Sequence, residues 1–160
     1  MSADRLSFWG IGPSMVLTAL AYAAVAWSVA WQWPEWCLVP PGIYPVLAVI
    51  GGCLLLLGLA LLVLAGRTVS AAYRGDQLAT TGAFGVVRHP VYAVWIVLLL
   101  PGLALLSGAW PVLPAPLVAY AVFRRRIGVE DRYLDERFGQ AYRDYRARVG
   151  QLLPRLWSPR

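Results

Sequence analysis

The sequence predicts an all-α, polytopic membrane protein with four transmembrane helices in two hairpins, followed by a cytoplasmic amphipathic helix at the C-terminal end. Hydrophobic residues make up 59% of the 160 positions and charged residues 14%, whereas soluble domains carry about a quarter charged residues. Three long runs contain no charge, and each has at least the roughly 20 residues that cross a bilayer. We expect a single membrane-embedded domain over residues 1–160.

The first hairpin is predicted over residues 11–33 and 43–66. Tryptophans gather where the first run ends, which suits the interface between membrane and water. The connection at 34–42 contains prolines and no basic residue, as expected for a loop on the outer side. Gly51 and Gly52 form a patch of small residues that permits close approach of a second helix.

The second hairpin is predicted over residues 91–123, which contain no charged residue. One helix of that length would span roughly 50 Å, whereas the hydrocarbon core is ~30 Å thick. Two short helices joined by a turn resolve this mismatch. Proline shortens or kinks helices, and four prolines occur within the run, at Pro101, Pro111, Pro114 and Pro116.

All 14 basic residues are arginines, and their positions predict the topology. None lies in 32–66 or in 101–120. Basic residues collect in cytoplasmic connections, so this spacing places both termini in the cytoplasm. It also explains the net charge of +6 without a nucleic-acid partner, and we expect none. The expected location is the inner membrane of a bacterium or archaeon.

The tail, residues 124–160, is polar but patterned. At about 100° per residue, its apolar side chains fall on one face, which predicts an amphipathic helix. Asp131 points into that face and Glu130 lies at its edge. A carboxylate on a buried face requires a cation, a hydrogen-bond donor or a ligand. The apolar stripe consists of Ile127, Leu134, Phe138, Tyr142, Tyr145 and Val149.

Several common functional sites are excluded by the motifs. One histidine and two separated cysteines cannot form a usual zinc site, and we expect no metal. There is no G-x-G-x-x-G or phosphate-binding loop, and no G-x-S-x-G setting near His89. The chemistry is concentrated in two polar islands, 77–92 and 126–145, which border the second hairpin at its cytoplasmic end. Their side chains suit a polar ligand that carries an amine and a carboxylate, beside an entrance from lipid.

A purely structural interpretation of the segment Arg88-His89-Pro90 stays open at this point. Pro90 is then the first residue of a helix, and Arg88 extends along the apolar surface to reach lipid phosphates.

Two segments resemble a known superfamily. The stretch TTGAFGVVRHPVY (80–92) resembles the T-x-G…RHPxY signature of the isoprenylcysteine carboxyl methyltransferase and phospholipid methyltransferase superfamily. The stretch EDRYLDERFGQAYRDYRARVGQLLP (130–154) is similar to its E-E-x-x-L-x-x-x-F-G-x-x-Y-x-x-Y pattern. The motifs occur in the right order across the second hairpin, and the resemblance covers residues 76–154, about half of the chain.

The resemblance implies a short membrane-embedded methyltransferase that depends on S-adenosyl-L-methionine and acts on a lipophilic acceptor. The family's cofactor pocket lies between the connector at 76–92, the RHPxY turn and the C-terminal helix. An arginine four residues before the first acid is associated with substrate, and here it is Arg126. The implied cofactor-binding positions are Gln77, Leu78, Ala79, Phe84, His89, Pro90, Tyr92 and Glu130.

Three positions depart from the pattern of the family. Asp131 replaces the second glutamate, Phe84 stands where tyrosine is common, and Val94 stands where many members have glycine. These departures bear on the acceptor, which stays open between a prenylated cysteine, a phospholipid amine and a small lipophilic acid or thiol. A carboxylate acceptor needs no general base, only a cation to place it.

Two other functions remain compatible with the sequence. Membrane sterol reductases resemble the same C-terminal half and bind a nicotinamide dinucleotide there, but only Arg74 and Arg88 lie near enough in the sequence to meet its additional phosphates. A non-catalytic assembly protein with a degenerate pocket is the other alternative. Titration with each cofactor distinguishes them.

Overall fold

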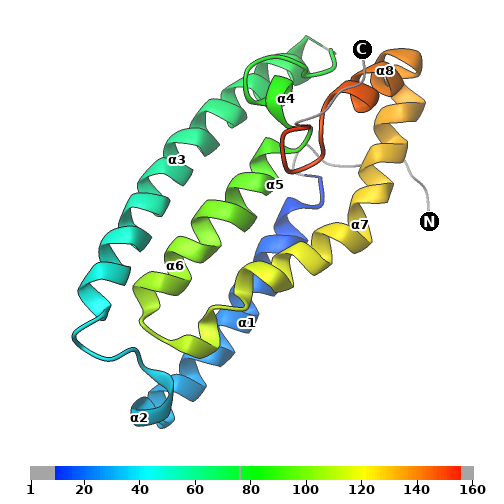
Figure 1. Ribbon diagram of the computed structural model, residues 1–160. Helices are drawn as coiled ribbons and strands as arrows, with labels where there is room; N and C mark the ends of the chain where they lie inside the picture. The colour runs from blue at the N-terminus through cyan, green and yellow to red at the C-terminus, as the bar shows by residue number, and fades with distance from the viewer. Residues whose placement is uncertain (1–9, 76, 156–160) are drawn as a thin grey trace.

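The computed structural model describes residues 10–75 and 77–155, and this part of the chain is helical with no β-strand. The first hairpin consists of α1 (Gly12–Gln32), the single turn α2 (Pro34–Cys37) and α3 (Tyr44–Arg74) (Figure 1). The predicted outer connection is therefore partly helical, with Pro34 at its favoured first position. Helix α3 continues beyond its predicted end at Gly66, so the polar connector begins as a helical extension.

The second hairpin folds as two helices joined by a turn. Its first arm is one continuous helix made of α5 (Pro90–Val94), the π-helical segment η1 (Trp95–Leu99) and α6 (Leu100–Ser107), and the short 3₁₀ segment η2 (Trp110–Val112) leads to α7 (Ala115–Phe138). The π segment directly precedes Pro101. This proline offers no N–H to the carbonyl one turn earlier and crowds it, and the Leu100 N–H bonds to Trp95 O, five residues back.

Three helices are long and apolar enough to cross a membrane: residues 12–32, 44–72 and 90–107. Helix α7 is not among them because Arg124 begins its charged half. Large apolar side chains are exposed on α1 and α3, including Leu17, Val49 and Leu56, as expected for surfaces that face lipid. The protein is therefore an all-helical integral membrane protein with three spans of this kind in its described part.

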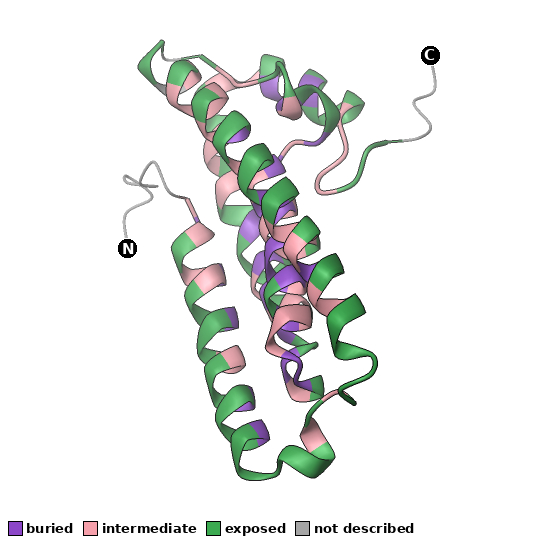
Figure 2. Ribbon diagram, turned by 90° about the vertical axis from the view of Figure 1, so that its left-hand side faces the viewer, coloured by how far each residue is buried: buried purple, intermediate pink, exposed green. Residues whose placement is uncertain are grey.

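Helix α1 packs against α7, and α3 packs against α5, η1 and α6. The predicted glycine patch takes part in the second contact. A Cβ on Gly51 would lie 2.8 Å from Gly102 O, and one on Gly102 would lie 2.9 Å from Gly51 O, so α3 and α6 cross at two facing glycines. Gly52 has open space around its Cα. Buried positions face the inside of the bundle (Figure 2).

The tail is not one continuous amphipathic helix, which corrects the prediction. Helix α7 runs to Phe138, and a separate helix, α8 (Gln140–Arg148), follows. Gly139 between them has φ +52° and ψ −125°, a conformation that only glycine adopts readily. The break turns α8 back over the end of the bundle (Figure 1). Residues 156–160 of the predicted tail lie outside the described residues.

The two ends of the bundle differ in character. At one end the connection after α1 meets the turn after α6, where the Val39 N–H donates to Gly108 O at 2.8 Å. The start of α1, the one-turn helix α4 (Ala83–Val86) and α8 lie at the other end (Figure 1). Most of the described arginines lie at that end, because they belong to the polar second half of α7 and to α8.

Candidate functional site

A cavity of about 670 Å³ lies at the arginine-bearing end of the bundle. This volume is within the ~300–1,000 Å³ range of small-molecule and cofactor sites. Its walls come from the starts of α1 and α5, the ends of α3 and α7, the connector before α5, and α8. Both polar islands of the sequence therefore meet at one cavity.

The RHP segment is held in place by its backbone. Proline disfavours helical backbone at the residue before it, and His89 is accordingly non-helical (φ −124°, ψ 63°) at the N-cap of α5, with Pro90 beginning the helix. The Arg88 N–H donates to Gly150 O at 2.7 Å, and the His89 N–H donates to Gln151 O at 3.1 Å. A segment more than 60 residues away thus fixes this turn.

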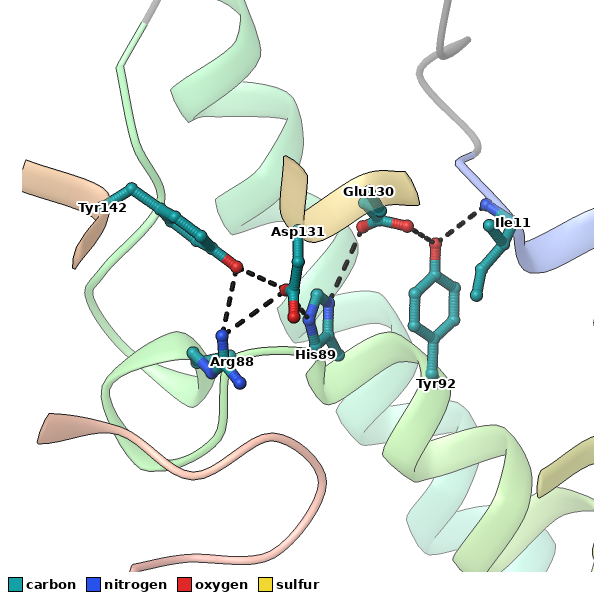
Figure 3. Close-up of polar contacts among 7 residues, drawn as sticks. All are labelled: Ile11, Arg88, His89, Tyr92, Glu130, Asp131 and Tyr142. Carbon is teal, nitrogen blue, oxygen red and sulfur yellow. Dashed lines mark hydrogen bonds and ion pairs between the residues drawn. The ribbon is translucent and has the colours of Figure 1, made fainter. Parts of the chain in front are cut away.

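The imidazole of His89 lies between two consecutive carboxylates of α7 (Figure 3). Its Nδ1 is 3.6 Å from Glu130 Oε1, and its Nε2 is 3.3 Å from Asp131 Oδ1. The side chain is only 4% exposed. Burial alone would lower the pKa of His89, but the two carboxylates outweigh this effect and raise it above its ordinary value.

Asp131 has the partners that its place on the apolar face requires. It accepts a hydrogen bond from the Tyr142 hydroxyl and another from Arg88 Nη1 at 3.4 Å, and Arg88 Nη1 also donates to the Tyr142 oxygen at 3.1 Å. Burial opposes its ionisation, but hydrogen bonds from His89 and Tyr142 and the nearby positive charges lower the pKa of Asp131 to about 2. This carboxylate is therefore an anion at neutral pH.

Arg88 points inward, which excludes the interpretation, left open by the sequence, in which it reaches out to lipid phosphates. Its side chain is 8% exposed because the buried carboxylate of Asp131 binds it. Within residues 10–75 and 77–155, Arg88 Nε is the buried side-chain nitrogen for which no hydrogen-bond partner is found. The two acids, the guanidinium and a protonated His89 sum to zero charge.

Three tyrosines complete the polar lining. Tyr92 donates to Glu130 Oε2 at 2.7 Å and accepts a hydrogen bond from the Ile11 N–H at 3.2 Å (Figure 3). Tyr145 donates to Phe84 O at 2.7 Å, which ties α8 to the connector. Burial raises the pKa of Tyr145 to about 12. Burial and the hydrogen bond to Asp131 also raise the pKa of Tyr142, so both phenols stay protonated donors.

The structure places eight of the nine predicted site residues around the cavity. Phe84, His89, Pro90 and Tyr92 are buried, whereas Gln77 is exposed at the rim. The other lining positions among them are Leu78, Ala79 and Glu130.

Arg126 lies elsewhere. Its side chain is exposed on α7, one turn before Glu130, and it does not line the cavity. Its role stays a prediction.

The site also contains residues that were not predicted. Arg88, Tyr142 and Tyr145 line the cavity, as does Gly10 before α1. The tyrosines carried a signal, because both belong to the F-G-x-x-Y-x-x-Y pattern of the tail. No motif pointed to the start of α1. No group of three or more histidine, cysteine, aspartate or glutamate side chains suited to a metal ion occurs within the described residues.

The family model of the isoprenylcysteine carboxyl methyltransferase (ICMT) family matches residues 43–136, a range that contains the RHPxY turn, both acids and most of the cavity wall. The protein belongs to this family. This match confirms the resemblance to the superfamily that the two motifs of the sequence indicated.

Three relatives carry the name protein-S-isoprenylcysteine O-methyltransferase. The Schizosaccharomyces pombe protein is 35% identical over 77 residues, which are 48% of this chain and 33% of the relative. The Dictyostelium discoideum protein is 30% identical over 48% of this chain and 32% of its own length. Form B from Arabidopsis thaliana is 28% identical over 49% of this chain and 40% of its own length. The matches thus span a third to two fifths of these eukaryotic relatives. No solved structure matches the chain.

The opposite shifts of His89 and Asp131 predict how stability depends on pH. Because the pKa of His89 is raised in the folded state, the protonated imidazole stabilises the fold fully below its ordinary pKa of ~6.5. This stabilisation is lost as pH rises through the pKa of the folded state. Because the pKa of Asp131 is lowered, its ionised carboxylate stabilises the fold above pH ~4, and this stabilisation is lost as pH falls toward 2. We expect the unfolding temperature in detergent to be highest between about pH 4 and 6.5.

The variant His89→Gln is the control for this pH profile, because the chain has no other histidine. It should lose most of the decline in unfolding temperature that the wild type shows as pH rises above about 6.5. A decline of the same size in both proteins would contradict the assignment to His89.

Proposed function

We propose that this protein transfers the methyl group of S-adenosyl-L-methionine to a lipophilic acceptor at the cytoplasmic face of the membrane, in the manner of an isoprenylcysteine carboxyl methyltransferase. One observation carries the proposal. The RHPxY turn and Glu130 of α7 line a single cavity, and His89 contacts both Glu130 and Asp131. Membership of the family supports the same chemistry.

The side chains around the cavity fit this cofactor. It carries a positive sulfonium, an amine, a carboxylate and an adenosine, and bound charges require partners of opposite sign or hydrogen bonds. Glu130 is half-buried and offers a carboxylate to the cationic groups, whereas Arg88 offers a guanidinium to an anionic one. Phe84 and Tyr145 provide buried aromatic surface beside the connector. The predicted set from Gln77 to Tyr92, with Glu130, would hold the cofactor.

Bound S-adenosylmethionine supplies an electrophilic methyl group on sulfur. Methyl transfer is an in-line displacement, so the protein contributes mainly by positioning the reactants. The network from Arg88 through Asp131 to His89 keeps the imidazole and its flanking acids in fixed places before the ligand arrives. The apolar cavity wall excludes water and thereby strengthens electrostatic contacts.

The acceptor is proposed to enter from the bilayer. Val16 of α1, Leu62 of α3 and Trp95 of η1 line the cavity, and all three belong to helices that are candidates for crossing the membrane. Such a wall suits an isoprenoid or acyl chain, while the polar cofactor reaches the site from the water side. Membrane lipids are the expected surroundings.

The proposal is tested by titrating the purified protein in lipid nanodiscs with S-adenosylmethionine and, separately, with a nicotinamide dinucleotide. We expect binding of the first alone. A screen with methyl-labelled cofactor then compares prenylated cysteine, phospholipid amines and small lipophilic acids and thiols. Binding of the dinucleotide in place of S-adenosylmethionine would favour a reductase, and binding of neither would favour an assembly protein.

Arg126 is proposed to place an anionic acceptor, because it lies one helical turn before Glu130 and close to the lipid boundary. Arg126→Ala should lower the methylation rate by an amount equivalent to about 2 kcal/mol, with cofactor affinity near that of the wild type. The variant Arg126→Lys should retain little of the methylation rate that alanine removes, since lysine lacks the bidentate fork of arginine. Arg124→Ala is the matched control, and equal small effects of both variants would reduce Arg126 to a membrane anchor.

The proposed topology has four crossings, with the apolar first half of α7 as the fourth and with both termini in the cytoplasm. Single cysteines at positions 38 and 78, in a background without Cys37 and Cys53, should be labelled from opposite sides of the membrane by an impermeant reagent. The physical reason is the confinement of arginine to alternate connections. Labelling of both positions from the same side would contradict the topology.

A further inference from the structure

The start of α1 lies against the candidate site, although it belongs to neither motif and precedes the family match at 43–136. Gly10 has a left-handed backbone, with φ +52°. A Cβ at this position would lie 2.5 Å from the Tyr92 hydroxyl oxygen and 2.7 Å from Glu130 Oε2. The absence of a side chain therefore leaves the space in which Tyr92 and Glu130 meet.

The backbone of Ile11 determines how the Tyr92 hydroxyl is used. Ile11 is the N-cap of α1, and the first N–H groups of a helix have no partner within it. The Ile11 N–H donates to the Tyr92 oxygen at 3.2 Å in a buried contact. A phenol has one proton, and that proton goes to Glu130 Oε2 at 2.7 Å.

These contacts form one chain from α1 to the histidine. The second oxygen of the Glu130 carboxylate, Oε1, is 3.6 Å from His89 Nδ1. The ring of Tyr92 also stacks on that of His89, with centroids 5.7 Å apart. A shift at the start of α1 would move Tyr92, then Glu130, and through Glu130 the surroundings of the imidazole.

We propose that Gly10 and Ile11 are positioning residues of this site: the Ile11 N–H orients the Tyr92 hydroxyl, and Gly10 leaves the room in which that hydroxyl holds Glu130 beside His89. The expected effect on S-adenosylmethionine binding rests on the proposed function. The expected effect on the position of Glu130 beside His89 does not. The first helix thus completes a site whose recognisable residues all lie at or after Gln77.

The test compares two substitutions at Gly10 with one at Gly108. Alanine introduces a Cβ and backbone strain, whereas asparagine introduces a Cβ but tolerates left-handed backbone better. Gly108→Ala is the matched control, because Gly108 also has a positive φ of +62° and its Cβ would lie 2.9 Å from the Tyr44 ring. It lies in the turn after α6, outside the cavity lining.

Calorimetry with S-adenosylmethionine in nanodiscs gives the first result. We expect both Gly10→Ala and Gly10→Asn to weaken binding about tenfold or more, as for loss of a hydrogen bond to a charged group. Gly108→Ala should stay within about twofold of the wild type, because Gly108 shares no partner with the cavity and lies at the other end of the bundle. Normal affinity in Gly10→Asn would assign any loss in Gly10→Ala to backbone conformation and overturn the proposal.

A double-mutant cycle with Tyr92→Phe connects the effect to the hydroxyl. Phenylalanine removes the oxygen nearest the added Cβ and releases Glu130 to move. Gly10→Ala should therefore weaken binding less in the Tyr92→Phe background than in the wild type. Equal effects in both backgrounds would show that Gly10 does not act through Tyr92.

A measurement without ligand separates this inference from the proposed function. The chain has one histidine, so its imidazole gives a single titration curve by NMR. The charged groups that face it are Glu130 and Asp131, with Arg88 behind the latter. Displacement of the hydroxyl that holds Glu130 nearby should lower the pKa of His89 in Gly10→Ala, whereas Gly108→Ala should leave it unchanged.

An unchanged His89 titration in both Gly10 variants would overturn the positioning role. Failure of the wild type to bind S-adenosylmethionine would instead remove the proposed function, and the titration would still decide whether α1 positions Glu130.

Discussion

We expect His89→Ala and Glu130→Ala each to weaken S-adenosylmethionine binding by about 30-fold or more, equivalent to at least ~2 kcal/mol. His89 is buried between Glu130 and Asp131, so removing the imidazole leaves two neighbouring acids that repel one another. Removing Glu130 takes away the acceptor of the Tyr92 hydroxyl and a carboxylate of the cavity lining that is proposed to meet the cationic groups of the cofactor.

Calorimetry in nanodiscs measures these affinities, and Glu136→Ala provides the control. Glu136 is an exposed acid on the same helix and does not line the cavity, so its loss changes the net charge as Glu130→Ala does, without touching the site. Unchanged affinity in both His89→Ala and Glu130→Ala would show that the cofactor pocket is misassigned.

Loss of Asp131 should have the largest effect on stability. We expect Asp131→Ala to lower the free energy of unfolding by about 3 kcal/mol, as for removal of one partner from a buried ion pair. Arg88, His89 and Tyr142 all bond to this carboxylate, so its removal leaves a buried guanidinium and a buried phenol without their acceptor. Asp131→Asn retains the shape and one acceptor oxygen, and it should cost less.

The matched control for Asp131 is the exposed ion pair between Asp135 and Arg143. Its atoms are 3.2 Å apart, but the two side chains are 39% and 55% exposed, and such pairs contribute about 1 kcal/mol or less. Denaturation in detergent should therefore separate Asp131→Ala clearly from Asp135→Ala. Similar losses in both variants would contradict the central role of the Asp131 network.

The sequence predicted the second hairpin well because its constraints are local. A charge-free run too long for one crossing must fold back, and Gly108 and Pro111 mark the place where it does. The need of Asp131 for partners also followed from the helical period alone. The partner could not be predicted in the same way. An arginine near lipid satisfies its charge equally well by reaching water or by pairing inward, and for Arg88 only the tertiary structure, which brings Asp131 and Tyr142 beside it, decides this.

The tail shows how two local signals compete. The apolar stripe continues in register past Gly139, which favoured one helix, but a glycine after Phe138 is itself a stop signal, and the structure follows the glycine. The contribution of α1 could not be predicted from residues at all. Backbone N–H groups leave no trace in a motif, and Gly10 is notable only because of what lies beside it in space.

The hydrogen bonds from Arg88 and His89 to Gly150 and Gln151 bear on how the protein is made. Chains emerge from the ribosome N-terminal end first, so the helices up to α7 are synthesised before the two carbonyls that complete the RHP turn. A nascent chain that ends before residue 151 can have its helices in the bilayer and still lack an ordered His89. Assembly of the polar cluster is therefore a late step in biogenesis, and a ribosome stalled just before Gly150 would carry an inserted but immature protein.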